Sequence, residues 1–375
     1  MKYRILFFIV LISCFIPAQK ITFFIKAKTN KAIIEEGLEY KSTWRISPNE
    51  PLDIYTLSKS PGSKKVIFKT DIDSLSISLK PGEHFDFTVI LNEKDSCKTR
   101  IESLPLKNYA SQKPVERDTI PFRLSSYNNI IIQVLVNKKD TIQLAFDTGT
   151  TDFEISEETF KSKLSSVQSW KKENQIQIGN QNFKNQKLYP IETKIYEADG
   201  LFGWNLFDGK IVEIDYDKKL MIVHTQLPDF IKHQKSYNGL ELHYIHDYLC
   251  IDGTLQLENK KFSSTFLFDS GYQKTLLLNS ELLKKQGYPL EEQRVLKETT
   301  LKNNHMQNIS TMVIRNEKLI LGKIRLKNVS AQVTTGESPT TIPLHILGNE
   351  ILKYFNTILD FQENKIYLKR NKLLY

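Results

Sequence analysis

Short runs of β-branched and aromatic residues recur along the chain, and clusters of Gly, Pro and Asn separate them. Runs of this kind are typical of β-strands joined by tight turns. Apolar residues make up 40% of the composition, which is enough to bury a substantial core. At about 150 residues per domain, a chain of 375 residues has room for two or three domains. The pattern therefore predicts an all-β protein with more than one domain.

Residues 19–108 are predicted to form a small, antiparallel, β-sandwich-like domain. Strand-like runs lie at residues 21–25, 65–68, 75–79 and 85–91. The turn-forming pairs Pro61-Gly62 and Pro81-Gly82 separate some of these runs. No group of residues in this region suggests catalysis. Residues 109–118 are mostly polar and contain a proline, and we interpret them as a linker.

The remainder of the chain contains one pattern twice. A strand at Ile130–Val136 turns and returns to Asp147, and a strand at Leu249–Leu257 turns and returns to Asp269. A hydroxyl residue and a glycine follow each aspartate, so that the motifs read Asp-Thr-Gly and Asp-Ser-Gly. One such tripeptide is common in ordinary turns. Two copies at matching places, each behind an apolar strand, indicate a duplicated unit that brings two carboxylates together.

Two further anchors repeat in the same order. An Ile-Gly or Leu-Gly pair ends at Gly179 in the first copy and at Gly322 in the second. An apolar-apolar-Gly element then ends at Gly203 in the first copy and at Gly348 in the second. A strand follows each of these elements at the same spacing. The match of spacing between the copies supports the duplication independently of the aspartates.

With these anchors, residues 120–370 resemble the aspartic peptidases of the pepsin and retropepsin type, and most of all the two-lobed secreted proteins of bacteria. The resemblance implies a pair of β-barrels, with lobe one at residues 119–228 and lobe two at 229–375. It also implies an aspartic-type endopeptidase that acts as a monomer on a peptide or protein substrate. The resemblance implies neither a cofactor nor a metal.

The resemblance further implies a role for each anchor. Asp147 and Asp269 would be the catalytic residues, and they would share a proton because two close carboxylates do not both ionise readily. The ionised partner would activate a water molecule, while the protonated partner would donate to the carbonyl oxygen of the scissile bond. The expected supporting residues of the two loops are Thr148, Gly149, Thr150, Ser270 and Gly271. The residues expected to pack beneath these loops are Leu201, Phe202, Gly203, Ile346, Leu347 and Gly348.

The two copies differ in length at one place. The stretch from Asp269 to Gly322 is 21 residues longer than that from Asp147 to Gly179. An excess of this size suits one β-hairpin, because the two arms of a hairpin satisfy each other's backbone groups. We predict a hairpin near residues 298–314 that acts as a flap over the aspartates, with its tip at Asn303, Asn304 and His305. The alternative is a longer surface loop.

Tyr272 departs from the family pattern, which favours Ser, Thr or Ala directly after Asp-Thr/Ser-Gly. A bulky ring at this position could obstruct the aspartates, or it could point away from them. The alternative function is therefore a non-catalytic peptide-binding or surface-interaction protein that reuses the fold. The position of the Tyr272 ring distinguishes the two functions.

The remaining composition narrows the possible partners. The net charge is +9, but the lysines are dispersed and no basic-aromatic motif or phosphate loop is present. We therefore expect no nucleic-acid binding. His243 and His246 alone do not make a metal site. Cys97 and Cys250 are too few for a disulfide framework, and the apolar run around Cys250 predicts a buried thiol.

The N-terminus predicts export from the cytoplasm. Lys2 and Arg4 precede an apolar run at Ile5–Ile16, which is shorter than the roughly 20 residues of a membrane span. We expect cleavage after residue 18 and release to the periplasm or the medium, with no transmembrane segment left. The alternative is lipidation at Cys14, which lies in a lipobox-like sequence. Mass spectrometry of the exported protein should give an N-terminus at Gln19, whereas a lipidated Cys14 would mean membrane anchoring.

Overall fold

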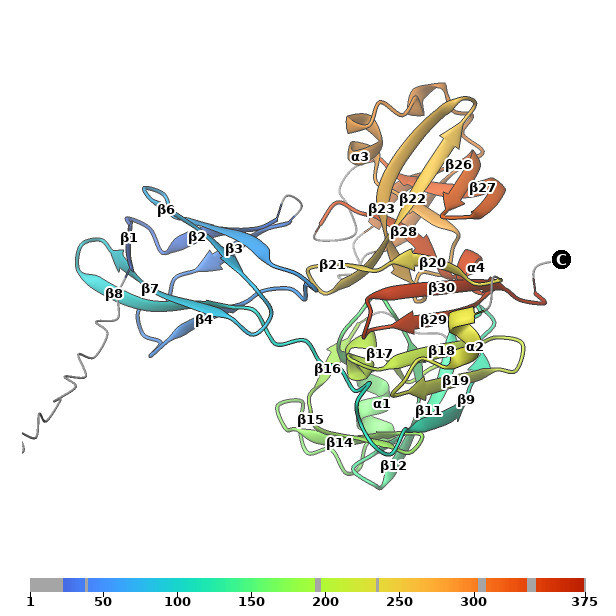
Figure 1. The fold of residues 1–375 in the computed structure, drawn as a ribbon, viewed down its shortest axis with the longest axis horizontal. Helices are drawn as coiled ribbons and strands as arrows, with labels where there is room; N and C mark the ends of the chain where they lie inside the picture. The colour runs from blue at the N-terminus through green and yellow to red at the C-terminus, as the bar shows by residue number, and fades with distance from the viewer. Residues whose placement is uncertain are drawn as a thin grey trace, which may run out of the picture.

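The computed structural model describes residues 23–37, 40–192, 197–233, 236–302, 308–335 and 342–373. Strands hold 54% of the residues and helices hold 7%, which confirms the predicted all-β class. The predicted signal peptide and Cys14 lie outside the described residues. Within these ranges, no helix has the length and apolar character needed to cross a membrane. The strands form two N-terminal sheets and three larger sheets (Figure 1).

Two four-stranded sheets enclose the core of the N-terminal region. The first sheet has the order β1 (Phe23–Ala27), β7 (His84–Leu91), β8 (Asp95–Glu102) and β4 (Asp53–Thr56). The second has the order β3 (Tyr40–Arg45), β2 (Lys31–Glu36), β5 (Lys64–Lys69) and β6 (Ser74–Leu79). Every second residue of most strands is buried, and Ile34 and Phe68 of one sheet share a core with Val89 and Ile101 of the other.

The prediction that this region is purely antiparallel is wrong. Strands β1 and β7 are parallel, and so are β4 and β8. Parallel neighbours need a long connection, and several other strands separate the members of each pair in the sequence. A strand's own residues do not indicate which distant strand will pair with it.

The lobe-one sheet presents the first aspartate. Its order is β15 (Gln181–Gln186), β14 (Asn174–Ile178), β11 (Ile130–Val136), β12 (Asp140–Phe146), β17 (Gly200–Phe202), β13 (Phe153–Ser156) and β16 (Leu188–Ile191), with β10 (Arg123–Leu124) beside β11. Helix α1 (Glu157–Ser162) follows β13, and the 3₁₀-helix η1 (Trp204–Phe207) follows β17. The predicted hairpin is confirmed, because β11 pairs with β12 and Asp147 comes directly after β12.

The lobe-two sheet repeats this plan. Its order is β21 (His243–Ile245), β22 (Tyr248–Leu257), β23 (Lys260–Asp269), β28 (His345–Gly348), β24 (Leu276–Leu278), β27 (Ile324–Thr334), β26 (Asn308–Leu321) and β25 (Lys297–Lys302). Its helices are α3 (Ser280–Lys285), η2 (Leu290–Glu292) and α4 (Asn349–Leu352). In this lobe β22 also pairs with β26, which closes a barrel. The counterpart of the long β27 is split into β15 and β16 in lobe one, which forms a half-barrel.

A six-stranded sheet joins the two lobes. Its order is β20 (Asn238–Glu241), β30 (Lys365–Arg370), β29 (Phe355–Asp360), β18 (Ile211–Asp215), β19 (Leu220–His224) and β9 (Arg117–Pro121), and α2 (Asp229–His233) lies in the connection between the lobes. Strands β18 and β29 meet antiparallel at its centre. Each lobe contributes three strands in mirrored order, so this sheet carries the same duplication as the sequence. Figure 1 shows these strands between the green and orange lobes.

The predicted linker at 109–118 is hydrogen-bonded to lobe one at both of its ends. The backbone N–H of Tyr109 donates to the carbonyl of Gly209, and Gln226 donates to the carbonyl of Ala110. Its last two residues differ from the prediction, because Arg117 already begins β9. The buried carboxylate of Asp118 accepts two hydrogen bonds from Asn180. The Asp118 side chain therefore binds lobe one, whereas the contacts of Tyr109 and Ala110 use the backbone of the segment.

Lys59 connects the N-terminal region to the body of the protein. Its ammonium forms an ion pair with Asp208 and lies 4.6 Å from the ring centroid of Tyr244. It also donates to the carbonyl of Phe361 at 3.4 Å. The Lys59 and Asp208 side chains are only 14% and 16% exposed, so each charge depends on the other.

Replacing Lys59 with methionine tests this contact. Lys59→Met keeps the apolar stem but leaves Asp208 without its close cationic partner, so the free energy of unfolding should fall by roughly 1–3 kcal/mol. Lys107→Met is the matched control, because Lys107 lies 4.0 Å from Asp208 and its side chain is 59% exposed. Equal effects of the two variants on urea unfolding would contradict the assignment of Lys59 as the anchor.

Candidate active site

The two aspartate loops lie against each other where the lobes meet. The side chains of Asp147 and Asp269 are hydrogen-bonded to each other. Glycine is required directly after the hydroxyl residue in both loops. A Cβ atom on Gly149 would lie 2.9 Å from Cγ of Asp269, and one on Gly271 would overlap the Asp147 carboxylate. Any side chain at either glycine would therefore force the two carboxylates apart.

Crossed hydrogen bonds between Thr148 and Ser270 fix the spacing of the loops. The backbone N–H of Thr148 donates to Oγ of Ser270, and the backbone N–H of Ser270 donates to Oγ1 of Thr148, both at 3.0 Å. Each hydroxyl then donates to a carbonyl of the opposite strand, at Phe268 and Phe146. Thr148 is fully buried and Ser270 is 4% exposed. These buried bonds hold the two aspartate loops against each other.

The apolar-apolar-Gly elements lie beside the aspartate strands as hydrogen-bonded neighbours. Leu201 and Phe202 belong to β17, which pairs in parallel with β12. Ile346 and Leu347 belong to β28, which pairs in the same register with β23. A side chain at Gly203 would overlap the carbonyl of Thr150, and one at Gly348 would overlap that of Lys274. These glycines let the aspartate loops pass close by.

The environment of the carboxylates is unequal, although the loops are similar. Asp269 Oδ1 accepts from the backbone N–H groups of Gly271 and Tyr272, at 2.8 and 2.9 Å. Asp147 Oδ1 accepts from Gly149 at 2.7 Å, whereas the N–H of Thr150 points to the Asp147 main-chain carbonyl. Two donors on one oxygen stabilise the ionised form of Asp269. The first aspartate is therefore better suited to hold the proton.

The electrostatics agree with this division. Burial raises the pKa of Asp147, and the nearby charge of Asp269 raises it further, while the backbone N–H groups of Gly149 and Gly271 lower it. Burial also raises the pKa of Asp269, but the hydrogen bond from Asp147 and the two backbone donors lower it. One proton shared by the pair satisfies both conditions, with Asp147 as its main site. As whole residues, Asp147 and Asp269 keep part of their surface exposed to solvent.

Other polar contacts around the loops come from residues that the sequence did not single out. Trp204, directly after Gly203, donates to the carbonyl of Asp247 in lobe two at 3.1 Å. Asn349, directly after Gly348, donates to the carbonyl of Asn128 in lobe one at 2.8 Å. These two bonds form a second crossed pair between the lobes. The sequence could have indicated these two residues, because each directly follows one of the repeated glycines.

Asn129 adds a further contact between the lobes. Its amide nitrogen donates to the carbonyl of Ser270 at 3.2 Å, and its amide oxygen accepts from Gln273 at 3.1 Å. Asn129 is only 4% exposed. No local pattern marked it, because its partners are distant in the sequence. It connects the start of β11 in lobe one to the second aspartate loop.

The Tyr272 ring lies against Gly348. A Cβ atom on Gly348 would lie 2.5 Å from Cδ1 of Tyr272. The hydroxyl donates to Oε1 of Gln332 at 2.6 Å, and the ring packs against the cluster that contains Leu277 and Ile346. The tyrosine therefore occupies the lobe-two side of the site.

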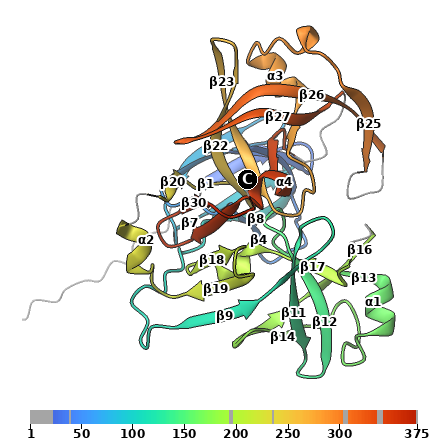
Figure 2. The ribbon, with the colours of Figure 1, turned by 90° about the vertical axis from the view of Figure 1, so that its right-hand side faces the viewer.

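The predicted hairpin after Asp269 is present. Strands β25 and β26 pair antiparallel from Lys297 with Val313 to Lys302 with Asn308. Figure 2 shows β25 at the outer end of the lobe-two sheet. The predicted flap residues Asn303, Asn304 and His305 lie outside the described residues. The lobe-one counterpart between α1 and β14 contains no strand in the described structure.

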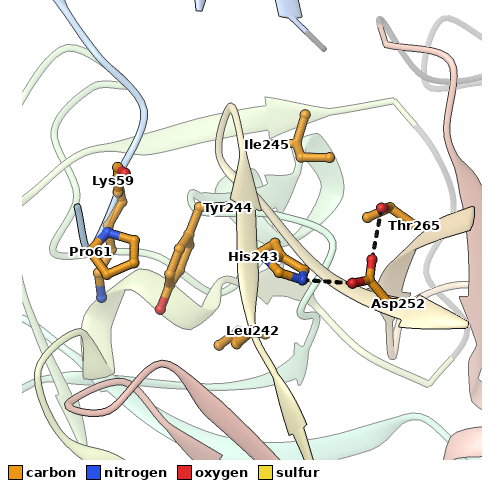
Figure 3. Close-up of a pocket in the computed structure, with 9 residues that line it drawn as sticks. Lys59, Pro61, Leu242, His243, Tyr244, Ile245, Asp252 and Thr265 are labelled. Atoms are coloured by element: carbon orange, nitrogen blue, oxygen red, sulfur yellow. Dashed lines mark hydrogen bonds and ion pairs between the residues drawn. The ribbon is translucent and has the colours of Figure 1, made fainter. Parts of the chain in front are cut away.

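A cavity of about 330 Å³ lies where the N-terminal region meets lobe two, and its lining includes neither aspartate. Figure 3 shows His243 in its wall, with Nε2 bound to Asp252 Oδ2 at 3.1 Å, while Thr265 donates to the other oxygen of Asp252. In the part of the chain that the structure describes, no three His, Cys, Asp or Glu side chains gather to hold a metal ion. Cys97 and Cys250 are buried in separate clusters, as predicted for Cys250.

Comparisons with known proteins give a distant structural similarity and no match in sequence. No protein-family model and no curated protein matches the sequence. Among solved structures, the chain is similar to the crystal structure of aspartic proteinase from Irpex lacteus, with a TM-score of 0.46 and 12% identity. The match covers 68% of this chain and 98% of that chain. At this level of similarity, any functional conclusion depends on the geometry of the chain's own residues.

The raised pKa of Asp147 gives a testable dependence of stability on pH. The folded protein keeps a proton that the unfolded chain releases above about pH 4. Stability from this group is therefore full below that pH and is lost as the pH rises towards the folded-state pKa. Asp147→Asn has no such proton to lose, so its stability relative to the wild type should rise by roughly 1–3 kcal/mol between pH 4 and 8.

Thermal unfolding at several pH values measures this difference. Asp252→Asn serves as the control, because the Asp252 side chain is 70% exposed to solvent. The control should follow the wild type across the whole range. A constant difference between Asp147→Asn and the wild type from pH 4 to 8 would show that Asp147 titrates normally.

Proposed function

We propose that this protein is an aspartic endopeptidase, in which Asp147 and Asp269 hydrolyse peptide bonds through an activated water molecule. The observation that carries the proposal is the hydrogen-bonded carboxylate pair, with its spacing fixed by the crossed bonds of Thr148 and Ser270. A pair of this kind holds one proton over a wide pH range. It can therefore supply a general base and a general acid at the same time.

The unequal hydrogen bonding supports a division of roles between the two aspartates. Asp269 carries the negative charge and takes a proton from a water molecule as its oxygen attacks the carbonyl carbon. Asp147 donates its proton to the carbonyl oxygen, which gives a neutral tetrahedral diol. When the C–N bond breaks, a diol hydroxyl returns its proton to Asp147, and the proton on Asp269 passes to the leaving amine. Each aspartate then regains its starting state.

The surrounding residues support these roles. The backbone N–H groups of Gly271 and Tyr272 keep the Asp269 carboxylate fixed towards the pair. Thr150 donates to Glu154 at 3.1 Å, which holds the lobe-one loop in shape. The partly buried Glu154 lies on the side of Asp147. Preorganised donors of this kind avoid the cost of reorienting dipoles during the reaction.

The proposal extends to partners and location. Each lobe supplies one of the two aspartates, so a single chain completes the site and a monomer suffices. The substrate would be an extended peptide or an unfolded segment of a protein. The basic and apolar N-terminus supports export, so we place the enzyme in the periplasm or the medium. A non-catalytic peptide-binding protein is the alternative, and a test for peptide cleavage separates the two.

The test is peptide cleavage by the purified mature chain. Residues 19–375 should cleave members of a mixed peptide library at some pH between 3 and 8, and pepstatin should inhibit cleavage. Asp147→Asn and Asp269→Asn should each reduce kcat/KM by roughly 1000-fold or more, because the pair acts as one unit. Asp252→Asn should cleave like the wild type.

Two results would contradict the peptidase. One is a single aspartate variant that keeps about half of the activity. The other is loss of activity with EDTA, because the two carboxylates supply both proton transfers. Peptide binding without cleavage at any pH would favour the non-catalytic alternative.

A further inference from the structure

A chain of hydrogen bonds leads from the second aspartate loop to the hairpin. The backbone N–H of Tyr272 donates to Asp269, and its hydroxyl donates to Oε1 of Gln332 at 2.6 Å. Nε2 of Gln332 then donates to Oγ1 of Thr299 at 2.9 Å. Thr299 lies in β25, the first arm of the hairpin. Two side chains thus connect Asp269 to an arm that is separate from it in the sequence.

The series of hydrogen bonds ends at Thr299, which is itself held by the neighbouring strand β26. Thr299 is opposite Thr311 in the β25–β26 ladder, and their hydroxyls are 2.8 Å apart. The Thr311 hydroxyl donates to the carbonyl of Thr299. Gln332 is 8% exposed and Thr311 is 2% exposed. Buried polar groups that lose a partner are costly, so this network favours a single arrangement.

Apolar contacts run beside the hydrogen bonds. The Tyr272 ring and Leu301 of β25 both pack against the cluster that contains Leu277 and Ile346. Ile346 belongs to β28, the strand paired directly with the aspartate strand β23. The hairpin arm and the aspartate loop therefore rest on the same group of side chains. A shift of one would disturb the other.

We propose that Tyr272 and Gln332 are positioning residues, which hold the hairpin arm β25 at a fixed place relative to Asp269. This inference rests on the proposed peptidase function for its kinetic consequence but not for its structural one. The proposed positioning role explains why this position holds a tyrosine, because the side chain of Ser, Thr or Ala is too short to reach Gln332 from the aspartate loop. The backbone N–H of Tyr272 also donates to Asp269, so one residue positions both the Asp269 carboxylate and the hairpin arm β25.

Three variants test the proposal. Tyr272→Phe keeps the ring along Gly348 and removes only the hydroxyl, while Gln332→Leu removes both ends of the amide contact. Tyr288→Phe is the matched control. The Tyr288 hydroxyl also bonds to an amide oxygen, that of Asn316 in β26, and Tyr288 is buried in the same lobe. Any general effect of losing a buried tyrosine hydroxyl should be equal in the control.

Hydrogen exchange of the backbone amides gives a readout that needs no activity. The amides of β25 at residues 298–302 should exchange faster in Tyr272→Phe and Gln332→Leu than in the wild type, whereas Tyr288→Phe should leave them unchanged. Exchange in β25 that stays unchanged in Tyr272→Phe, or rises equally in Tyr288→Phe, would overturn the proposal. If exchange responds as expected but the wild type cleaves no peptide, the positioning contact stands and the peptidase assignment fails.

The kinetic consequence is measured on the same three variants. Misplacement of the arm and of the Tyr272 N–H should lower kcat/KM by roughly 10- to 100-fold in Tyr272→Phe and Gln332→Leu. A weaker N–H bond to Asp269 destabilises the ionised base, so the acidic limb of the kcat/KM profile should move to higher pH. Tyr288→Phe should keep both values. A loss of activity that is the same in all three variants, with no shift of the acidic limb, would mean a structural role only.

Discussion

The hydrogen bonds that cross between Thr148 and Ser270 are the constraint on which the rest of the site depends. Two buried carboxylates repel each other when both are charged, and nothing in an isolated loop would keep them together. The four bonds of the two hydroxyl residues tie each loop to the other and to the strand behind it. The repulsion is then relieved by a shared proton instead of by separation of the lobes.

The duplication makes the two aspartate loops similar, and small differences between the loops make the two carboxylates chemically unequal. Both loops have the same hydroxyl and glycine positions, but only the second has its following N–H group on the aspartate carboxylate. That difference stabilises the charge on Asp269 and leaves the proton on Asp147. The residue that supplies this N–H group is Tyr272, whose hydroxyl also donates to Gln332. Gln332 in turn donates to the hairpin, which has no counterpart among the described residues of lobe one. Tyr272 therefore contributes both to the charge difference between the two aspartates and to the contact with the lobe-two hairpin.

Much of the fold around the aspartates could be predicted from the sequence because it follows from local patterns. The β11–β12 and β22–β23 hairpins consist of apolar runs with a clear turn between them, and the excess before Gly322 had the length and composition of a hairpin. The parallel pairing of β1 with β7 could not be predicted, because pairing between distant strands leaves no local pattern. For the same reason the sequence did not indicate the bond of Asn129 to Ser270 in the other lobe or the bond of Gln332 to Thr299. Trp204 and Asn349 could be predicted only from their equivalent positions directly after the repeated glycines.

The most direct test of the shared proton is NMR of the aspartate carboxyl carbons, labelled with ¹³C and followed from pH 3 to 9. Asp147→Asn and Asp269→Asn identify the two signals. The pair should titrate in two separate steps, with the upper step far above the ordinary aspartate range near pH 4 and observed mainly at Asp147. In Asp269→Asn the Asp147 step should move to lower pH, because the neighbouring charge is gone. Two independent titrations near pH 4, unchanged by either substitution, would contradict the shared proton and with it the proposed mechanism.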